Sequence, residues 1–395
     1  MRFHFSFLLV LFSGQLAVAQ IYKTSSTIEH YLITDSTPYR NQIAAWDYSY
    51  IGDHYTALRV HDTIIDNTVG HRPEPVIGAI ISARNELEGY HPSPALPFIL
   101  DAAKNTRIVI INEAHHNASH RLFAASLLPG LSKLGYHFFG AEALSHTDSN
   151  LNSRKTVLLS SGSYTVEPCF ANLLREAVDL GYQIFPYEAG PNDFGKYREI
   201  VQAENIKKVL DQHPDSKLFI YCGYDHAVED SLSHDWLLAM AGRLKQITGI
   251  DPLTIDQVEL SERIPASGEN AYRHSMSASY SAVWVDKDGK VFNQANENKY
   301  YDLNIYHPNT ELINGRPKWR YTSATRAVRC SGIDQFPTLV LAYRESEDIT
   351  QAVPVDVVEI REKGANFPLL LPTGKYTVVY RAVDGTEKVW KKQVH

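Results

Sequence analysis

The central part of the chain alternates short apolar runs with longer segments of helical periodicity. Apolar runs predict strands at 108–112, 136–141, 182–187 and 217–222, and the segments between and after them predict helices at about 119–134, 168–180, 196–211 and 230–247. Strands joined by helical crossovers tend to lie parallel in one sheet. The pattern from 107 to about 249 therefore predicts an α/β fold with a central sheet and flanking helices.

The C-terminal part has a different pattern, in which apolar and polar residues alternate across tight turns. Segments 338–343 and 355–360 have the composition of strands, and segments 376–383 and 386–394 flank the Asp384-Gly385 dipeptide. Asp-Gly supplies the positive φ angles that a tight hairpin turn requires. We therefore expect a small antiparallel, β-sandwich-like module at the end of the chain.

Breaks in these patterns divide the chain into four parts. Residues 1–19 combine a short charged start, an apolar stretch and a small-residue cleavage pattern, as a cleavable export signal does. Residues 20–96 predict a helical extension, which ends at the proline-rich run His91–Pro97. The α/β domain with insertions would occupy 97–332, and the β module 333–395. We expect a secreted or periplasmic protein.

Composition excludes several classes of function. The formal net charge is -7 without a basic block, so we expect no nucleic-acid partner. After the export signal no apolar segment reaches the roughly 18 residues of a membrane helix, so we expect no membrane span. Three cysteines, Cys169, Cys222 and Cys330, are too few for a disulfide-framed fold, although one disulfide and one free thiol would be compatible with their number.

Ionisable side chains follow the ends of all four predicted strands. They are Glu113, His115, His116, Glu142, Glu188, Asp225 and His226. Ligands of parallel sheets bind beyond the carboxyl ends of the strands, so we expect these groups to converge in one site. Imidazole and carboxylate groups act as general bases and also bind zinc and similar ions. The simpler alternative for each residue is a helix cap, a structural histidine or an ion pair at the rim of the sheet.

The order of these residues resembles a known superfamily. The pattern consists of Glu113, His115, His116, Asn117 and His120 before a helix, Glu142 after the next strand, Arg198 at the start of a later helix, and Gly223 and His226 after the last strand. It is similar to the Tiki/EreA/ChaN-like superfamily of erythromycin-esterase-like hydrolases, metal-dependent proteases and haem-binding proteins, over residues 105–230. The esterase-like pattern would select His116 as the site histidine and the ChaN-like pattern His115, which we favour.

We therefore expect an exported hydrolase, esterase- or peptidase-like, that acts on a small-molecule or peptide substrate. The expected catalytic residues are Glu113, His115, His116, Glu142, Arg198 and His226. Glu113 and a neighbouring histidine would activate water, directly or through a metal, while Arg198 and His226 would stabilise oxyanion charge. A divalent metal ion, if bound, would have the ligands His115, Glu142, Glu188 and His226.

Two other classes of function remain open from the sequence. The ChaN-like resemblance implies a protein that binds haem or another iron ligand through tyrosine or histidine. The terminal β module would also suit a surface interaction protein. A serine-triad hydrolase has little support, because the chain has no Gly-x-Ser-x-Gly elbow.

Overall fold

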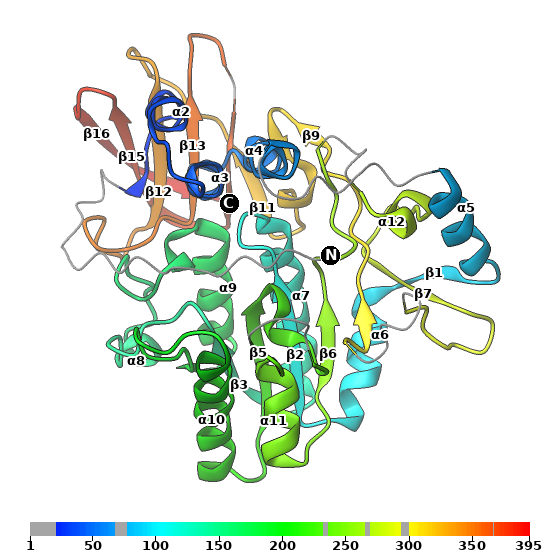
Figure 1. Ribbon diagram of the computed structural model, residues 1–395. Helices are drawn as coiled ribbons and strands as arrows, with labels where there is room; N and C mark the ends of the chain where they lie inside the picture. The colour runs from blue at the N-terminus through cyan, green and yellow to red at the C-terminus, as the bar shows by residue number, and fades with distance from the viewer. Residues whose placement is uncertain (1–20, 68–76, 232–235, 265–268, 294–299, 366) are drawn as a thin grey trace.

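The computed structural model describes residues 21–67, 77–231, 236–264, 269–293, 300–365 and 367–395 (Figure 1). The expected export signal at 1–19 lies outside the described residues. Within the described ranges, no helix combines the length and the apolar character needed to cross a membrane.

A six-stranded parallel sheet forms the centre of the molecule, in the order β4-β3-β5-β2-β6-β8. Its strands are β2 (Ile108–Glu113), β3 (Tyr136–Ala141), β4 (Gln183–Pro186), β5 (Lys217–Gly223), β6 (Leu253–Asp256) and β8 (Leu303–Asn304). All six residues of β2 are buried, and the register pairs Glu113 with Gly223. The predicted α/β fold with a central parallel sheet is confirmed.

Helices cover both faces of this sheet. They are α6 (Ala95–Ala102), α7 (Ala118–Lys133), α8 (Leu151–Arg154), α9 (Pro168–Asp179), α10 (Lys196–Gln212) and α11 (Met240–Thr248). Val109 and Ile111 of β2 belong to the core beneath α6, α7 and α9, whereas Ile108 and Ile110 belong to the core beneath α10 and α11. Successive side chains of a strand point to opposite faces, so the buried β2 serves both cores.

The last predicted helix starts later than expected. The sequence predicts a helix from 230, but α11 begins at Met240, and 232–235 lie outside the described residues. The carbonyl of Val228 accepts a hydrogen bond from the N–H of Gly242. Val228 and Glu229 therefore lie against the first turn of α11, because Gly242 has no side chain to hold them away.

Antiparallel sheets form the C-terminal part, as predicted. The largest, in the order β13-β12-β15-β16, contains β12 (Thr338–Arg344), β13 (Asp356–Ile360), β15 (Gly374–Ala382) and β16 (Glu387–Val394). The turn between β15 and β16 uses Gly385 at φ 84°. β11 (Thr325–Val328) pairs with β14 (Leu369–Pro372), so one strand of this region lies before position 333.

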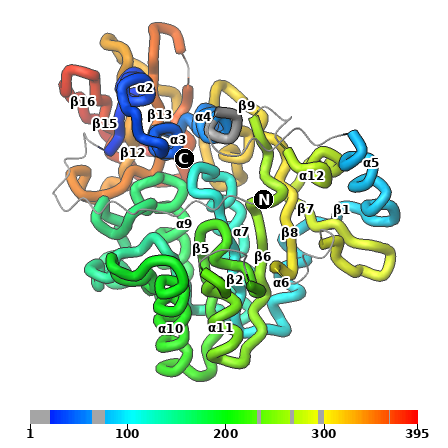
Figure 2. The backbone as a smooth tube through the Cα atoms, in the orientation of Figure 1, coloured from blue at the N-terminus to red at the C-terminus, as the bar shows by residue number. Residues whose placement is uncertain are grey.

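The N-terminal helices pack on this C-terminal sheet (Figures 1 and 2). They are α2 (Ser25–Thr34), α3 (Arg40–Tyr50) and α4 (His54–Asn67). Their shared core contains Tyr22, Ile28, Tyr48 and Ile51 together with Leu339, Leu341, Val357 and Val379. The two ends of the chain thus form one layer, and Trp46 of α3 brings that layer to the carboxyl ends of the central strands.

Smaller elements complete the described structure. They are α5 (Ile77–Glu86), α12 (Ala271–Ser275), the antiparallel pair β1 (His91–Pro94) and β7 (Ala282–Val285), and the pair β9 (Leu312–Ile313) and β10 (Arg316–Pro317).

Candidate active site

The predicted ionisable residues gather at the carboxyl edge of the central sheet. Glu113 ends β2, Glu142 directly follows β3, and Gly223 ends β5. Arg198 reaches them from the first turn of α10, and His226 from the 3-10 turn after β5. Because parallel strands end at one edge, segments more than a hundred residues apart in sequence meet here.

Glu113 is saturated by hydrogen bonds. Arg121 donates to both of its oxygens, with Nε 2.6 Å from Oε2 and Nη2 2.8 Å from Oε1, and the hydroxyl of Tyr221 lies 2.7 Å from Oε2. His115 Nδ1 lies 2.9 Å from Oε1. Burial would raise the pKa of Glu113, but Arg121 and His115 outweigh it and hold the pKa well below 4.5. Both oxygens of Glu113 are therefore occupied by Arg121, Tyr221 and His115, and its role as the general base stays a prediction.

His115 is the histidine that faces the site. Because Glu113 takes the Nδ1 hydrogen, Nε2 carries the lone pair that can accept a proton. Its ring stacks on Tyr164, with centroids 4.1 Å apart, and Trp46 meets it edge-on at 6.4 Å. A Cβ on Gly223 would lie 2.6 Å from Nε2 and 3.3 Å from Oε2 of Glu142. Glycine at this position thus lets the ring and the carboxylate share one narrow space.

We expect Gly223→Ala to lower any turnover by about 10²-fold, because a displacement of His115 by the new methyl group misaligns the reacting atoms. The overall fold should be kept, since the ring can shift. Gly78→Ala is the matched control, because Gly78 lies exposed on α5 and its added Cβ would meet nothing within 4 Å. Initial-rate measurements on both variants check this, and unchanged turnover in Gly223→Ala would contradict the close packing.

His226 forms a second histidine–glutamate pair. Its Nδ1 lies 2.8 Å from Oε2 of Glu199, an oxygen that also accepts the backbone N–H of Met240. Its Nε2 lies 2.7 Å from Nη1 of Arg198 and 3.5 Å from Oε1 of Glu142. Burial and Arg198 favour the neutral ring, but the two carboxylates outweigh them and raise the pKa of His226 above 6.5.

Glu199 is a site residue that the sequence interpretation missed. The only signal was its place next to Arg198 at the start of a helix. It is fully buried, whereas acidic residues near a helix N-terminus are usually exposed and interact with the helix dipole.

Glu142 and Glu188 are joined by Arg198. Nη2 of Arg198 lies 2.5 Å from Oε1 of Glu142 and 2.6 Å from Oε2 of Glu188, and the N–H of Gly223 donates to Oε2 of Glu142 at 2.6 Å. Burial would raise the pKa of Glu142, but His226 and Arg198 outweigh it and lower the pKa to about 2. The side chains of Arg198 and Glu188 are 18% and 21% exposed, so they form the solvent side of the site.

The side chains predicted as metal ligands do not form a metal cage here. Arg198 bonds to three of the four predicted ligands, Glu142, Glu188 and His226. Among the described residues, the groups with donor atoms close enough for a metal ion are His54, Glu167 and Cys169, and His61, Asp62 and His116. The predicted ligand set of His115, Glu142, Glu188 and His226 is therefore replaced, at this edge, by an arginine-centred network.

His116 lies beside α4 and not beside Glu113, so its predicted catalytic role stays a prediction without a contact to support it. Its ring stacks on that of His61 of α4, with centroids 3.4 Å apart and an angle of 9°. Burial keeps the pKa of His116 well below 6.5. Beyond the end of β2, the two neighbouring histidines point into different surroundings, so only one of them reaches Glu113.

All three cysteines are free thiols, so no disulfide joins them. Cys169 and Cys222 are buried, and Cys330 is half-buried. Burial raises the pKa of the Cys222 thiol well above 9.0, in agreement with its predicted role as a core residue.

Comparisons with known proteins give only weak, fold-level likenesses. No protein-family model and no curated protein matches the chain. Among solved structures, the type III effector HopBA1 is similar with a TM-score of 0.34 and 12% identity, over 55% of this chain and 96% of that one. RRSP, a MARTX toxin effector domain from Vibrio vulnificus CMCP6, has a TM-score of 0.29 and 16% identity, over 53% and 44% of the two chains. ChaN of Campylobacter jejuni, solved with cofacial haem, has a TM-score of 0.32 and 9% identity, over 54% and 92%.

The histidines expected for haem binding do not present an axial ligand. His115 and His116 are 6% and 3% exposed. One ring is covered by Tyr164 and the other by His61. A haem ligand must leave a broad apolar space in front of its nitrogen, so these two residues do not fit that group.

Proposed function

We propose that this chain is an exported hydrolase, of the esterase or peptidase type and with an EreA/ChaN-like core, that acts on a small-molecule or peptide substrate. One observation carries the proposal. Two histidines, His115 and His226, each held at Nδ1 by a buried glutamate, stand on either side of Glu142 and Arg198 at the carboxyl edge of the sheet. Such pairs hold an imidazole in one tautomer and orientation for proton transfer.

His115 acts as the general base. Its Nε2 takes a proton from a water molecule, whose oxygen forms a bond to the carbonyl carbon of the substrate. The arginine-held glutamate Glu113 stabilises the imidazolium that results, because its own pKa stays far below neutrality. When the tetrahedral intermediate breaks down, the leaving group takes a proton from a site histidine and the carbonyl bond re-forms.

Arg198 stabilises the negative charge that develops on the carbonyl oxygen, and His226 accepts a hydrogen bond from Arg198 at Nε2. Both are held in place before the substrate arrives, Arg198 by Glu188 and His226 by Glu199. Preorganised charges in a site that excludes bulk water are worth more than the same charges in water. Glu142 binds Arg198 and lies 3.5 Å from Nε2 of His226, so it positions both side chains.

The N-terminal helices belong to this site in our proposal. Residues 1–19 direct export, and 20–96 form the extension that supplies Trp46 beside His115. Residues 97–332 form the catalytic domain, and 333–395 form the module against which the extension packs.

Hydrolysis assays on the purified full-length protein test the proposal. A panel of p-nitrophenyl esters and fluorogenic peptides should include at least one substrate that turns over, and turnover should persist after dialysis against a chelator. Because Nε2 of His226 accepts from Arg198 only when the ring is neutral, the rate should be lost as the pH falls through the raised pKa of His226, above 6.5. Activity that disappears with the chelator and returns with a metal ion would overturn the metal-independent mechanism.

A further inference from the structure

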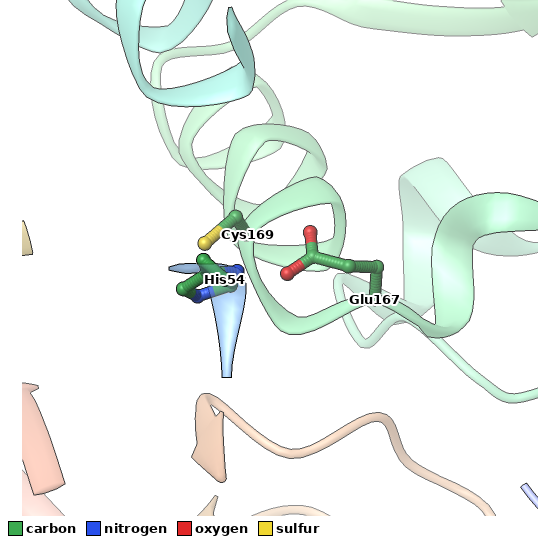
Figure 3. Close-up of side chains that lie close together, drawn as sticks. All are labelled: His54, Glu167 and Cys169. Atoms are coloured by element: carbon green, nitrogen blue, oxygen red, sulfur yellow. The ribbon is translucent and has the colours of Figure 1, made fainter. Parts of the chain in front are cut away.

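Three buried side chains that commonly bind metals meet outside the active site. His54 begins α4, Glu167 is the N-cap of α9, and Cys169 lies in the first turn of α9. Figure 3 shows the sulfur of Cys169 just above the His54 ring and the carboxylate of Glu167 to its right. Their ligand atoms all lie within 4.8 Å of one another. The group joins the N-terminal layer to the α/β domain.

Several atoms of this group have no hydrogen-bond partner in the described structure. They are Nδ1 and Nε2 of His54 and Oε1 of Glu167. Both residues are at most 2% exposed. An unsatisfied buried polar atom costs about 1–3 kcal/mol, and native proteins keep few of them. A neutral imidazole has one lone pair and one N–H, so one nitrogen of His54 and Oε1 of Glu167 each offer a lone pair without a partner, which indicates a ligand that accepts them.

Two of the three groups bear on how an ion would bind. Burial and the nearby guanidinium of Arg320 keep the pKa of His54 well below 6.5, so the ring is neutral and offers a lone pair. Nη1 of Arg320 lies 2.8 Å from Sγ of Cys169, but burial outweighs this charge and raises the pKa of the thiol to about 12, so a bound metal ion would have to displace its proton. Asp356 binds Arg320 at 2.9 Å and so offsets part of its charge.

Each donor also matches one class of metal. Cysteine sulfur, histidine nitrogen and carboxylate oxygen are the protein ligands of zinc. Soft thiolate ligands disfavour magnesium and calcium, which take oxygen donors. The second close group, His61, Asp62 and His116, is less suited. Its two rings stack at 9°, so their nitrogens lie side by side instead of converging, and Asp62 already binds Arg263 and the N–H of Ile264.

We propose that His54, Glu167 and Cys169 bind one divalent transition-metal ion of the zinc class, in a structural site separate from the active site. The ion fastens α4 to α9. Oε2 of Glu167 also accepts from Nη1 of Arg121 at 2.9 Å, so the same carboxylate belongs to the Arg121 network. This proposal does not depend on hydrolase activity.

Cobalt substitution tests the site. Full-length protein is produced in medium that contains Co²⁺ as the main transition metal, so that the ion enters during folding. We expect about one cobalt per chain by mass spectrometry of bound metals. We also expect a near-ultraviolet sulfur-to-cobalt charge-transfer band. Protein made in zinc medium should carry about one zinc ion and no such band.

Cysteine variants identify the ligand. The band should vanish in Cys169→Ser and persist in Cys222→Ser, which removes another buried thiol. If Cys169→Ser does not fold, the double variant Cys222→Ser/Cys330→Ser decides. Cys169 is then the one cysteine that remains in the chain, so the charge-transfer band must still be present. Absence of metal in the wild type, a band that survives Cys169→Ser, or a band lost in the double variant would each overturn the proposal.

Discussion

Arg121→Met is expected to lower the free energy of unfolding by about 3–5 kcal/mol, the range measured when one partner of a buried ion pair is removed. Arg121 is 1% exposed and binds two buried carboxylates, Glu113 and Glu167. Methionine fills much of the same space but donates no hydrogen bond. Both carboxylates would then stay buried without their cation, or take up protons at a cost in stability.

Urea unfolding at neutral pH measures this loss. Arg344→Met is the matched control, because Arg344 is 39% exposed and pairs with an exposed aspartate, Asp179, at 3.2 Å. Its unfolding free energy should change by no more than about 0.5 kcal/mol. A similarly small change in Arg121→Met would show that the buried network contributes little to the fold. Glu113→Gln should also destabilise the protein, since it removes one charge of the same network.

His115→Ala is expected to lower turnover by about 10²–10⁴-fold, the usual contribution of a general base. The neighbouring residue supplies the control, because His116 stacks on His61 and has no contact with Glu113 or Glu142 that would give it a role in the reaction. His116→Ala should retain turnover within a few fold of the wild type, since substitutions far from a site usually have small effects.

Both variants are checked by measuring their turnover rates on the substrate that the hydrolysis panel identifies. Their melting temperatures are measured as well. The His115→Ala protein should keep a native-like melting temperature, since Arg121 and Tyr221 still satisfy Glu113. Equal losses of turnover in the two histidine variants would refute the assignment of His115 as the base. A loss only in His116→Ala would reverse the choice between the two histidines.

Much of the fold follows from local pattern. Strands β2, β3, β4 and β5 and helices α7, α9 and α10 lie within about two residues of their predicted bounds, because each carries a clear apolar period and is flanked by turn residues. Strands β6 and β8 were not predicted. β6 has four residues and pairs with β2, and β8 has two residues and pairs with β6. Both are strands because a neighbouring strand offers an edge for pairing.

The candidate site was predictable only in outline. Parallel topology places the ends of β2, β3 and β5 together, so the gathering of Glu113, Glu142 and His226 follows from the order of elements. The choice between His115 and His116 does not, since adjacent residues at a strand end have nearly the same local sequence. The sequence also did not predict the buried partners Arg121, Glu199 and Tyr221. Each lies on a helix or strand, and only the packing of these elements decides which residues they face.

By itself, the sequence determined the repeating strands and helices, the parallel sheet, the terminal antiparallel sheet and the edge at which charged residues collect. Only the tertiary structure decided which charge each of them meets. Arg121 and Glu167 are 46 residues apart, and Arg198 and Glu142 are 56 apart. Pairing over such separations depends on distances and burial that arise when the elements pack, and those distances place His115 beside Glu113 and Arg198 beside both Glu142 and Glu188.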